Sequence, residues 1–189
     1  MDRQTDNQQR KVNEIEIAWL AGFMDGEGSI GIKVQSYHPI KKGNYAYFAP
    51  YVQIVNTHYG SIMKVDDILT RMHVGHHISE ARRHLNPNGK RTVDEYKRLW
   101  RILINGLKRC KPFLIEITPY LVVKKEDAEM VIDFINSRES NYYKQSPYSQ
   151  RDLDIVNRFR SVRRSGRANK VISLKSLNDY MRNTDEVKV

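Results

Sequence analysis

Two carboxylates stand between glycines in the stretch Asp25-Gly26-Glu27-Gly28, directly after a small-residue, apolar segment. That segment is expected to end a helix, and a carboxylate beside the negative end of a helix dipole costs about 0.3–1 kcal/mol. A helix end selected only for stability carries Lys or Arg instead. A divalent metal ion held by oxygen ligands would supply the missing positive charge. The stretch therefore predicts a metal-binding acid, in a chain whose formal net charge is +10.

The charge balance of the whole chain points to a polyanionic partner. The 189 residues include 32 Lys plus Arg against 22 Asp plus Glu, with a pI near 9.7. Nucleic acid, an acidic membrane surface and a merely basic soluble protein all fit this balance. The single cysteine, Cys110, excludes an internal disulfide and a zinc site with several cysteines, and it is expected to be a small buried side chain.

Nothing in the sequence predicts a membrane protein or a secreted one. No apolar run approaches the roughly 18–20 residues that span a bilayer, and the polar segment 1–11 lacks the apolar core of a signal peptide. We therefore expect an intracellular protein with no membrane partner. The sequence leaves open whether the compartment is a bacterial or phage-host cytoplasm or an organelle such as a mitochondrion or chloroplast.

Hydrophobic periodicity and turn signals predict the order α-β-β-α-β-β-α, followed by further helices. Asn13 and Glu16 resemble a capping box that opens the first helix, which is expected to run to about Asp25. The other expected elements are strands at 29–36, 45–56, 76–84 and 95–105, and helices at 61–72, 107–117, 124–137, 148–163 and 174–182.

Three small residues recur every four positions along the first helix: Ala18, Gly22 and Gly26. Such a ridge lets another helix approach closely. The same helix of a second subunit is the natural partner, because a twofold axis makes an interface self-complementary. The alternative is that the ridge packs against the chain's own sheet.

The motif Leu20-Ala-Gly-Phe-Met-Asp-Gly-Glu-Gly28 resembles the signature of the LAGLIDADG homing endonucleases. The resemblance covers about residues 13–137. It implies an α+β fold with an αββαββα core, a four-stranded antiparallel saddle-shaped sheet and C-terminal helices. A single motif implies a homodimer. The chain would then divide into an N-terminal arm (1–12), the endonuclease core (13–140) and a basic helical extension (141–189).

The resemblance also implies roles for individual residues. Glu27 would be the catalytic metal-binding acid, with Mg²⁺ as the cofactor, Mn²⁺ as a substitute and the Gly26 carbonyl as a further contact. Asp25 would be structural, at the dimer interface with Ala18 and Gly22, and would cap the partner's helix. Lys124 would reach back to the catalytic site, although a solvated helix start is the alternative. Asn56 would be catalytic, because it stands where the family usually has a Gln whose amide lies near the attacking water.

Side-chain alternation assigns one face of each strand to a core and the other to a ligand. Polar and basic side chains on the outward faces suit base reading in the major groove, although a solvated sheet face would look similar. They are Lys33, Gln35, Tyr51, Gln53, Lys97 and Arg101. Arg163 and Arg164 belong to a basic cluster expected to contact phosphates, with a solvated helix as the alternative. His73, His76 and His77 span a predicted helix-to-strand break, so a zinc site is not expected.

Taken together with these features, the resemblance implies a metal-dependent, site-specific endonuclease that cuts both strands of a long pseudo-palindromic double-stranded DNA target. By resemblance, it would be encoded by a mobile intron. The alternative is a non-cleaving protein on the same scaffold, either a maturase that binds intron RNA or a DNA-binding regulator. Loss of the acid at position 27 would mark that alternative, and Glu27 is retained.

Overall fold

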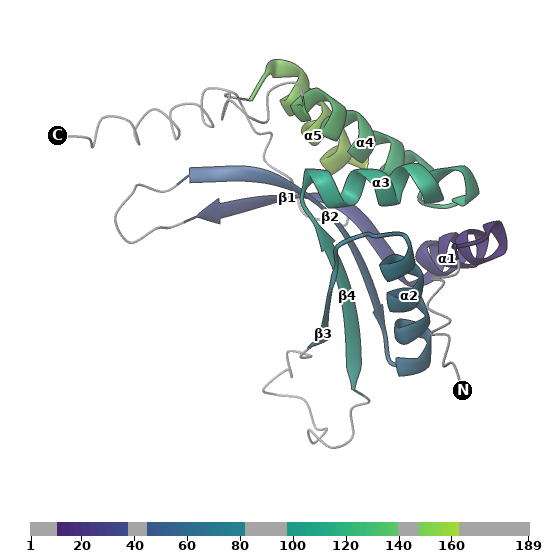
Figure 1. Ribbon diagram of the computed structural model, residues 1–189. Coiled ribbons are helices and arrows are strands. Elements are labelled where there is room, and N and C mark those ends of the chain that lie inside the picture. The colour runs from purple at the N-terminus through teal and green to yellow at the C-terminus, as the bar shows by residue number, and fades with distance from the viewer. Residues whose placement is uncertain (1–10, 38–44, 82–97, 140–147, 163–189) are drawn as a thin grey trace, which may run out of the picture.

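The computed structural model describes residues 11–37, 45–81, 98–139 and 148–162. Within these ranges a four-stranded sheet is combined with five α-helices and a short 3₁₀-helix (Figure 1). In chain order the elements are α1 (Glu14–Glu27), β1 (Gly28–Tyr37), β2 (Tyr45–Asn56), α2 (Tyr59–Arg71), β3 (His77–Ala81), β4 (Leu99–Asn105), α3 (Leu107–Ile117), η2 (Thr118–Tyr120), α4 (Lys125–Glu139) and α5 (Gln150–Val162).

All strand pairs in the sheet are antiparallel, and the spatial order is β1-β2-β4-β3. Gly28 is opposite Ile54, so β1 begins near the end of β2. The same end of β2 pairs with β4, where Asn56 is opposite Trp100. The predicted α+β class and αββαββα order are confirmed.

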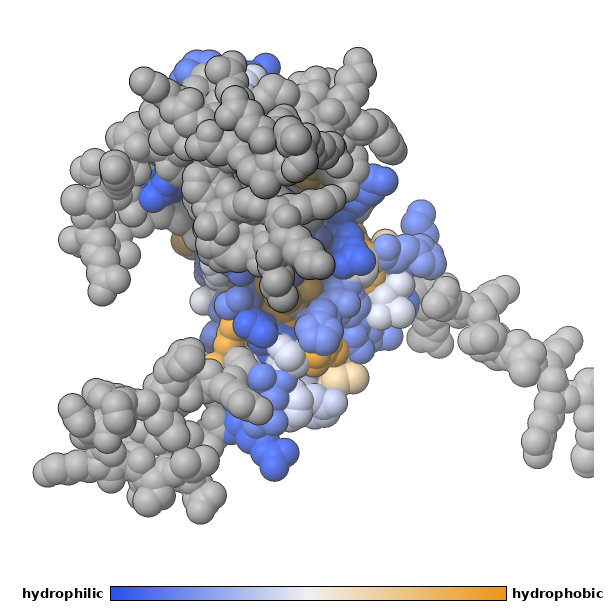
Figure 2. Space-filling model, turned by 90° about the vertical axis from the view of Figure 1, so that its left-hand side faces the viewer, coloured by the Kyte–Doolittle hydropathy of each residue, from blue (hydrophilic) through white to orange (hydrophobic). Residues whose placement is uncertain are grey.

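Among the described residues, the five helices lie on one side of the curved sheet and no helix lies on the other (Figure 1). The view onto that free side shows mainly hydrophilic described residues with small hydrophobic areas between them (Figure 2). The described part of this side that Figure 2 shows is therefore mainly polar, as the alternation in the sequence predicts.

The capping box at the start of α1 forms as predicted. The Asn13 side chain accepts from the backbone N–H of Glu16, and the Glu16 carboxylate accepts from the N–H of Asn13. At the other end, an ideal Cβ at Gly28 would lie 2.6 Å from the carbonyl oxygen of Met24 and closer still to its side chain. Only glycine allows the chain to leave α1 this tightly, so β1 begins in the residue after Glu27.

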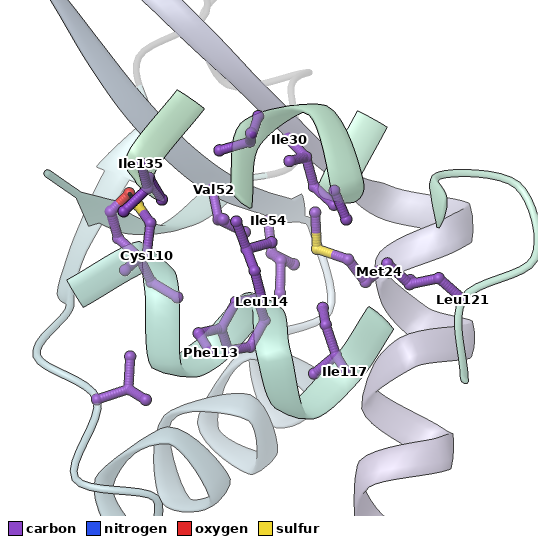
Figure 3. Close-up of a cluster of buried hydrophobic side chains, with 14 of the residues drawn as sticks. Met24, Ile30, Val52, Ile54, Cys110, Phe113, Leu114, Ile117, Leu121 and Ile135 are labelled. Carbon is purple, nitrogen blue, oxygen red and sulfur yellow. Dashed lines mark hydrogen bonds between the residues drawn. The ribbon is translucent and has the colours of Figure 1, made fainter. Parts of the chain in front are cut away.

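The core fills the space between the sheet and the helices (Figure 3). Alternate residues of the strands point into it, among them Ile30, Val52, Ile54, Ile102 and Ile104. Cys110 is fully buried there, as expected, and burial raises the pKa of its thiol to about 12.

Helix α5, which the sequence-based division assigns to the C-terminal extension, packs into the same core through Leu153, Val156 and Phe159. Ser149 and Asp152 form a capping box that the sequence analysis missed, since Asp152 Oδ2 accepts from the Ser149 N–H at 2.8 Å. Burial acts to raise the pKa of Asp152, but hydrogen bonds from Ser137 and Ser149 and the Arg138 charge outweigh it and lower that pKa.

The predicted boundaries need small corrections. Helix α1 extends two residues beyond Asp25, β3 is described only as far as Ala81, and β4 begins at Leu99 rather than at 95. Among the described helices, none combines the length and apolar character required to cross a membrane. The predicted helix at 174–182 lies outside the described residues.

Candidate active site and nucleic-acid interface

The carboxylate of Asp25, at the end of α1, is hydrogen-bonded within its own chain. Its carboxylate accepts backbone N–H groups from the segment between η2 and α4, at 2.8 Å from Val122, 3.2 Å from Val123 and 2.9 Å from Lys124. Partial burial acts to raise the pKa of Asp25, but these three hydrogen bonds outweigh it and the pKa is lowered. Within one chain, Asp25 therefore holds the Val122–Lys124 segment at the end of α1, and the expectation that it caps the partner's helix stays a prediction.

Lys124 is brought to the same place by these contacts. Its Nζ donates to the backbone carbonyl of Asp25, so the ammonium group lies at the negative end of the α1 dipole. Lys124 is half-buried and precedes α4, which begins at Lys125. The alternative of a merely solvated helix start does not describe it. The structure thus joins Lys124 to the acidic end of α1, as the sequence analysis expects.

Glu27 differs from Asp25 in having no partner among the described residues. It is the last residue of α1, it is exposed, and within the described residues its carboxylate forms no hydrogen bond or ion pair. Gly26 beside it is also exposed, and a Cβ built there would meet nothing within 4 Å. The two neighbouring carboxylates therefore have different environments: that of Asp25 is hydrogen-bonded within the chain, whereas that of Glu27 is open to a ligand.

The oxygen donors at this point suit a hard divalent cation held by few protein ligands. In the described part of the chain, no three His, Cys, Asp or Glu side chains lie together as a metal site. Mg²⁺ commonly uses one or two carboxylates and takes its other ligands from waters and substrate phosphates. Glu27, with the carbonyl groups that end α1, fits that donor set.

Asn56 lies two residues beyond Ile54, the register partner of Gly28, and so near the start of β1. Its side-chain oxygen accepts the backbone N–H of His58 at 2.7 Å, which turns the chain towards α2. His58 in turn caps α2 by accepting the Ser61 N–H at 3.1 Å. The structure gives Asn56 a structural use, and its predicted catalytic role stays a prediction.

Tyr51 and Lys33 form an ordered pair on the helix-free face. The Lys33 ammonium lies 4.0 Å from the centroid of the Tyr51 ring. The ring lies across Gly31, where an ideal Cβ would come within 2.8 Å of Tyr51 Cε1. The Tyr51 hydroxyl is 3.4 Å from Ser29 Oγ. Tyr51 thus supports Lys33 on this face, a relation that the sequence analysis did not foresee.

The structure describes only some of the other residues predicted to contact DNA. Arg101 lies on the helix-free face of β4, where its Nε and Nη2 donate to Ser79 Oγ at 3.3 and 3.1 Å. Gln53 is half-buried, and by alternation with buried Val52 and Ile54 it shares the face of Tyr51. Gln35 lies in β1, where only its backbone is described. Lys97, Arg163 and Arg164 lie outside the described residues.

The small-residue ridge of α1 does not pack against the chain's own sheet. Ala18 and Gly22 are exposed, and a Cβ at Gly22 would meet nothing within 4 Å. The buried side of α1 is instead formed by Leu20, Ala21 and Met24. Ile15 continues the exposed ridge and is 81% exposed. Beside the end of the helix, Val122 and Val123 are 84% and 76% exposed. An apolar surface is therefore left open around α1.

His76 is hydrogen-bonded within its own chain. His76 uses both ring nitrogens within the chain, at 2.7 Å from the Val74 carbonyl and 2.6 Å from Asp66 Oδ1. The expectation that His73, His76 and His77 hold no zinc stays a prediction.

Comparison with known proteins places this arrangement in a fold family. No family model matches the sequence, and no curated protein matches it in sequence. Solved structures do match, among them the homing endonuclease I-CvuI in complex with DNA and Mg (TM-score 0.59, 16% identity, covering 92% of this chain and 96% of that one). The archaeal intron-encoded homing endonuclease I-Vdi141I in complex with DNA matches with a TM-score of 0.60 and 14% identity. This match covers 91% of this chain and 98% of that one. The LAGLIDADG homing endonuclease I-GzeII in complex with its DNA target matches with a TM-score of 0.52 and 16% identity. This match covers 87% of this chain but only 48% of that one.

The chain therefore has the LAGLIDADG homing endonuclease fold, as its sequence motif predicts. At 14–16% identity, the likeness to these structures concerns the fold.

Proposed function

We propose that this chain is a homodimeric, metal-dependent and site-specific DNA endonuclease that cuts both strands of a long pseudo-palindromic target. One observation carries the proposal. The exposed carboxylate of Glu27 has no partner among the described residues, although it stands at the negative end of a helix. Stability alone disfavours that placement, whereas a cation bound between the protein and a phosphate would compensate for it.

The residues of the chain divide the work at this site. Asp25 holds the Val122–Lys124 segment against the end of α1 and so fixes Lys124. Lys124 carries a positive charge to the place where negative charge develops on the scissile phosphate. Glu27 supplies the carboxylate ligand, with the Gly26 carbonyl as a further candidate. Mg²⁺, or Mn²⁺ in its place, would lower the pKa of a water molecule and stabilise the phosphate charge.

The exposed ridge of α1 supports the homodimer. Ala18 and Gly22 allow the backbones of two such helices to approach closely, which would bring two copies of Glu27 near a common axis. The chain spans 96–98% of I-CvuI and I-Vdi141I but only 48% of I-GzeII, a chain about twice as long. Two copies of this chain would match the size of that longer protein.

The helix-free face of the sheet would then hold the DNA, as a β-ribbon lies in the major groove. Lys33 and Arg101 place positive charge there, and the structural neighbours named above are complexed with DNA. We further propose that the chain is intron-encoded and acts inside a cell, in a cytoplasm or an organelle that holds DNA. A role in binding intron RNA is compatible with the same surface.

A cleavage assay tests the proposal. The DNA on either side of the open reading frame is joined without the interruption, cloned in a plasmid and incubated with the purified chain and Mg²⁺. The proposal predicts a single double-strand cut at the junction, and EDTA should abolish it. Binding to the junction without cutting, under Mg²⁺ and Mn²⁺ alike, would support the DNA-binding regulator instead. Binding to the intron RNA alone would support the maturase.

A further inference from the structure

The helix-free face holds two described cations, and each is supported in a different way. The Lys33 ammonium lies over the Tyr51 ring, a contact that leaves the group free to turn. Arg101 is held directionally, because two nitrogens of its guanidinium donate to one oxygen, Ser79 Oγ. A directional contact fixes which edge of the guanidinium faces a ligand. Of the two cations, Arg101 is therefore better suited to recognise a particular base.

The contact between Arg101 and Ser79 is built into the register of the sheet. Ser79 of β3 is the direct partner of Arg101 on β4, and Val55 of β2 is the partner on the other side. Arg101 is thus a long cation on a central strand between two short side chains. Within the described ranges no carboxylate forms an ion pair with Arg101, so its charge is held by a neutral hydroxyl and remains uncompensated there.

The geometry of the guanidinium determines what remains for a ligand. Arginine has five N–H donors in a rigid plane. Ser79 occupies the edge formed by Nε and Nη2, at 3.3 and 3.1 Å. The remaining edge with two parallel N–H groups is the terminal one, between Nη1 and Nη2. In the major groove that fork matches the O6 and N7 acceptors of guanine.

We infer that Ser79 is a positioning residue that holds Arg101 so that its terminal edge reads one guanine in each half of the DNA target. The inference rests on the proposed function and adds a base identity to it. A phosphate would also accept this fork, but phosphates line the rim of the groove. A cation on a central strand, between Val55 and Ser79, faces the groove floor where the base edges lie.

The inference is tested by a binding profile in which every base pair of the target is changed in turn. The wild-type chain should prefer guanine at one position per half-site by about 5- to 100-fold. Arg101→Ala and Arg101→Lys should abolish that preference. Ser79→Ala should reduce it several-fold at the same position and leave the profile elsewhere unchanged, whereas Ser79→Thr, which keeps the hydroxyl, should retain it.

Ser29→Ala is the matched control, because Ser29 lies on the same face but contacts Tyr51 rather than Arg101. It should leave the guanine preference intact. An unchanged profile in Ser79→Ala would overturn the inference. So would an Arg101→Ala variant that binds all sequences more weakly by one factor and loses about one unit of salt slope, because that is the signature of a phosphate contact. A wild-type chain with no preferred sequence would instead refute the proposed function.

Discussion

Neutralising the two carboxylates at the end of α1, one at a time, should change stability in opposite directions. Asp25→Asn keeps the shape of the side chain but removes the charge that accepts the N–H groups of Val122, Val123 and Lys124. Glu27→Gln removes a charge that has no partner among the described residues and that faces the negative end of the helix dipole.

The sizes of the two effects follow from these contacts. A hydrogen bond to a charged group contributes about 1.5–3 kcal/mol. Three bonds to one carboxylate are not additive, and water can replace part of them because Val122 and Val123 are exposed. We therefore expect Asp25→Asn to lower the free energy of unfolding by about 2 kcal/mol, or roughly 4–8 °C in Tm for a chain of this size. Glu27→Gln should raise it by about 0.3–1 kcal/mol.

Thermal unfolding at one fixed protein concentration measures both changes, since a dimer's Tm depends on concentration. The pKa of Asp25 is lowered in the folded chain, so its contribution is present above the usual value of 3.8 and is lost as the pH falls below it. The gap between wild type and Asp25→Asn should therefore narrow below about pH 4. An Asp25→Asn chain that melts within about 1 °C of wild type, or an equal loss in Glu27→Gln, would refute the assigned division of roles.

Three further predictions concern the rest of the molecule. Asp152 has a lowered pKa, so its stabilising contribution should disappear as the pH falls below 3.8, and Asp152→Asn should show less acid-induced loss in urea titrations than wild type. Gly31→Ala must displace the Tyr51 ring and should weaken DNA binding about fivefold in a filter-binding assay; unchanged affinity would contradict the proposed support of Lys33. Gly22→Leu meets open space within one chain, so it should fold with unchanged circular dichroism yet sediment as a monomer; a persistent dimer would exclude this ridge as the interface.

Local signals in the sequence predicted the main elements well. The capping box of α1 depends on residues three apart, and the core faces of the strands depend on alternation, so both can be found without tertiary contacts. The Ser149–Asp152 box has the same kind of signature and was visible in principle. The fold class and the acidic end of α1 were therefore predictable.

Contacts between distant segments could not be predicted from the residues alone. Asp25 bonds to groups 97–99 positions away, so only the fold reveals that it caps its own chain. The pairing of Arg101 with Ser79 depends on a register between β3 and β4 that no short motif specifies. The flat placement of Tyr51 depends likewise on the missing Cβ of Gly31 on the neighbouring strand. Alternation gave the face of each residue, but the neighbours on that face had to come from the structure.

The most direct test of the central claim is single-turnover cleavage by Glu27→Gln, with binding of the same DNA measured in parallel. Glu129→Gln, which changes an exposed glutamate on α4, is the matched control. The account predicts that Glu27→Gln cuts slower by on the order of 1000-fold while its Kd stays within about threefold of wild type, and that Glu129→Gln cuts normally. Cleavage by Glu27→Gln at the wild-type rate would contradict the account.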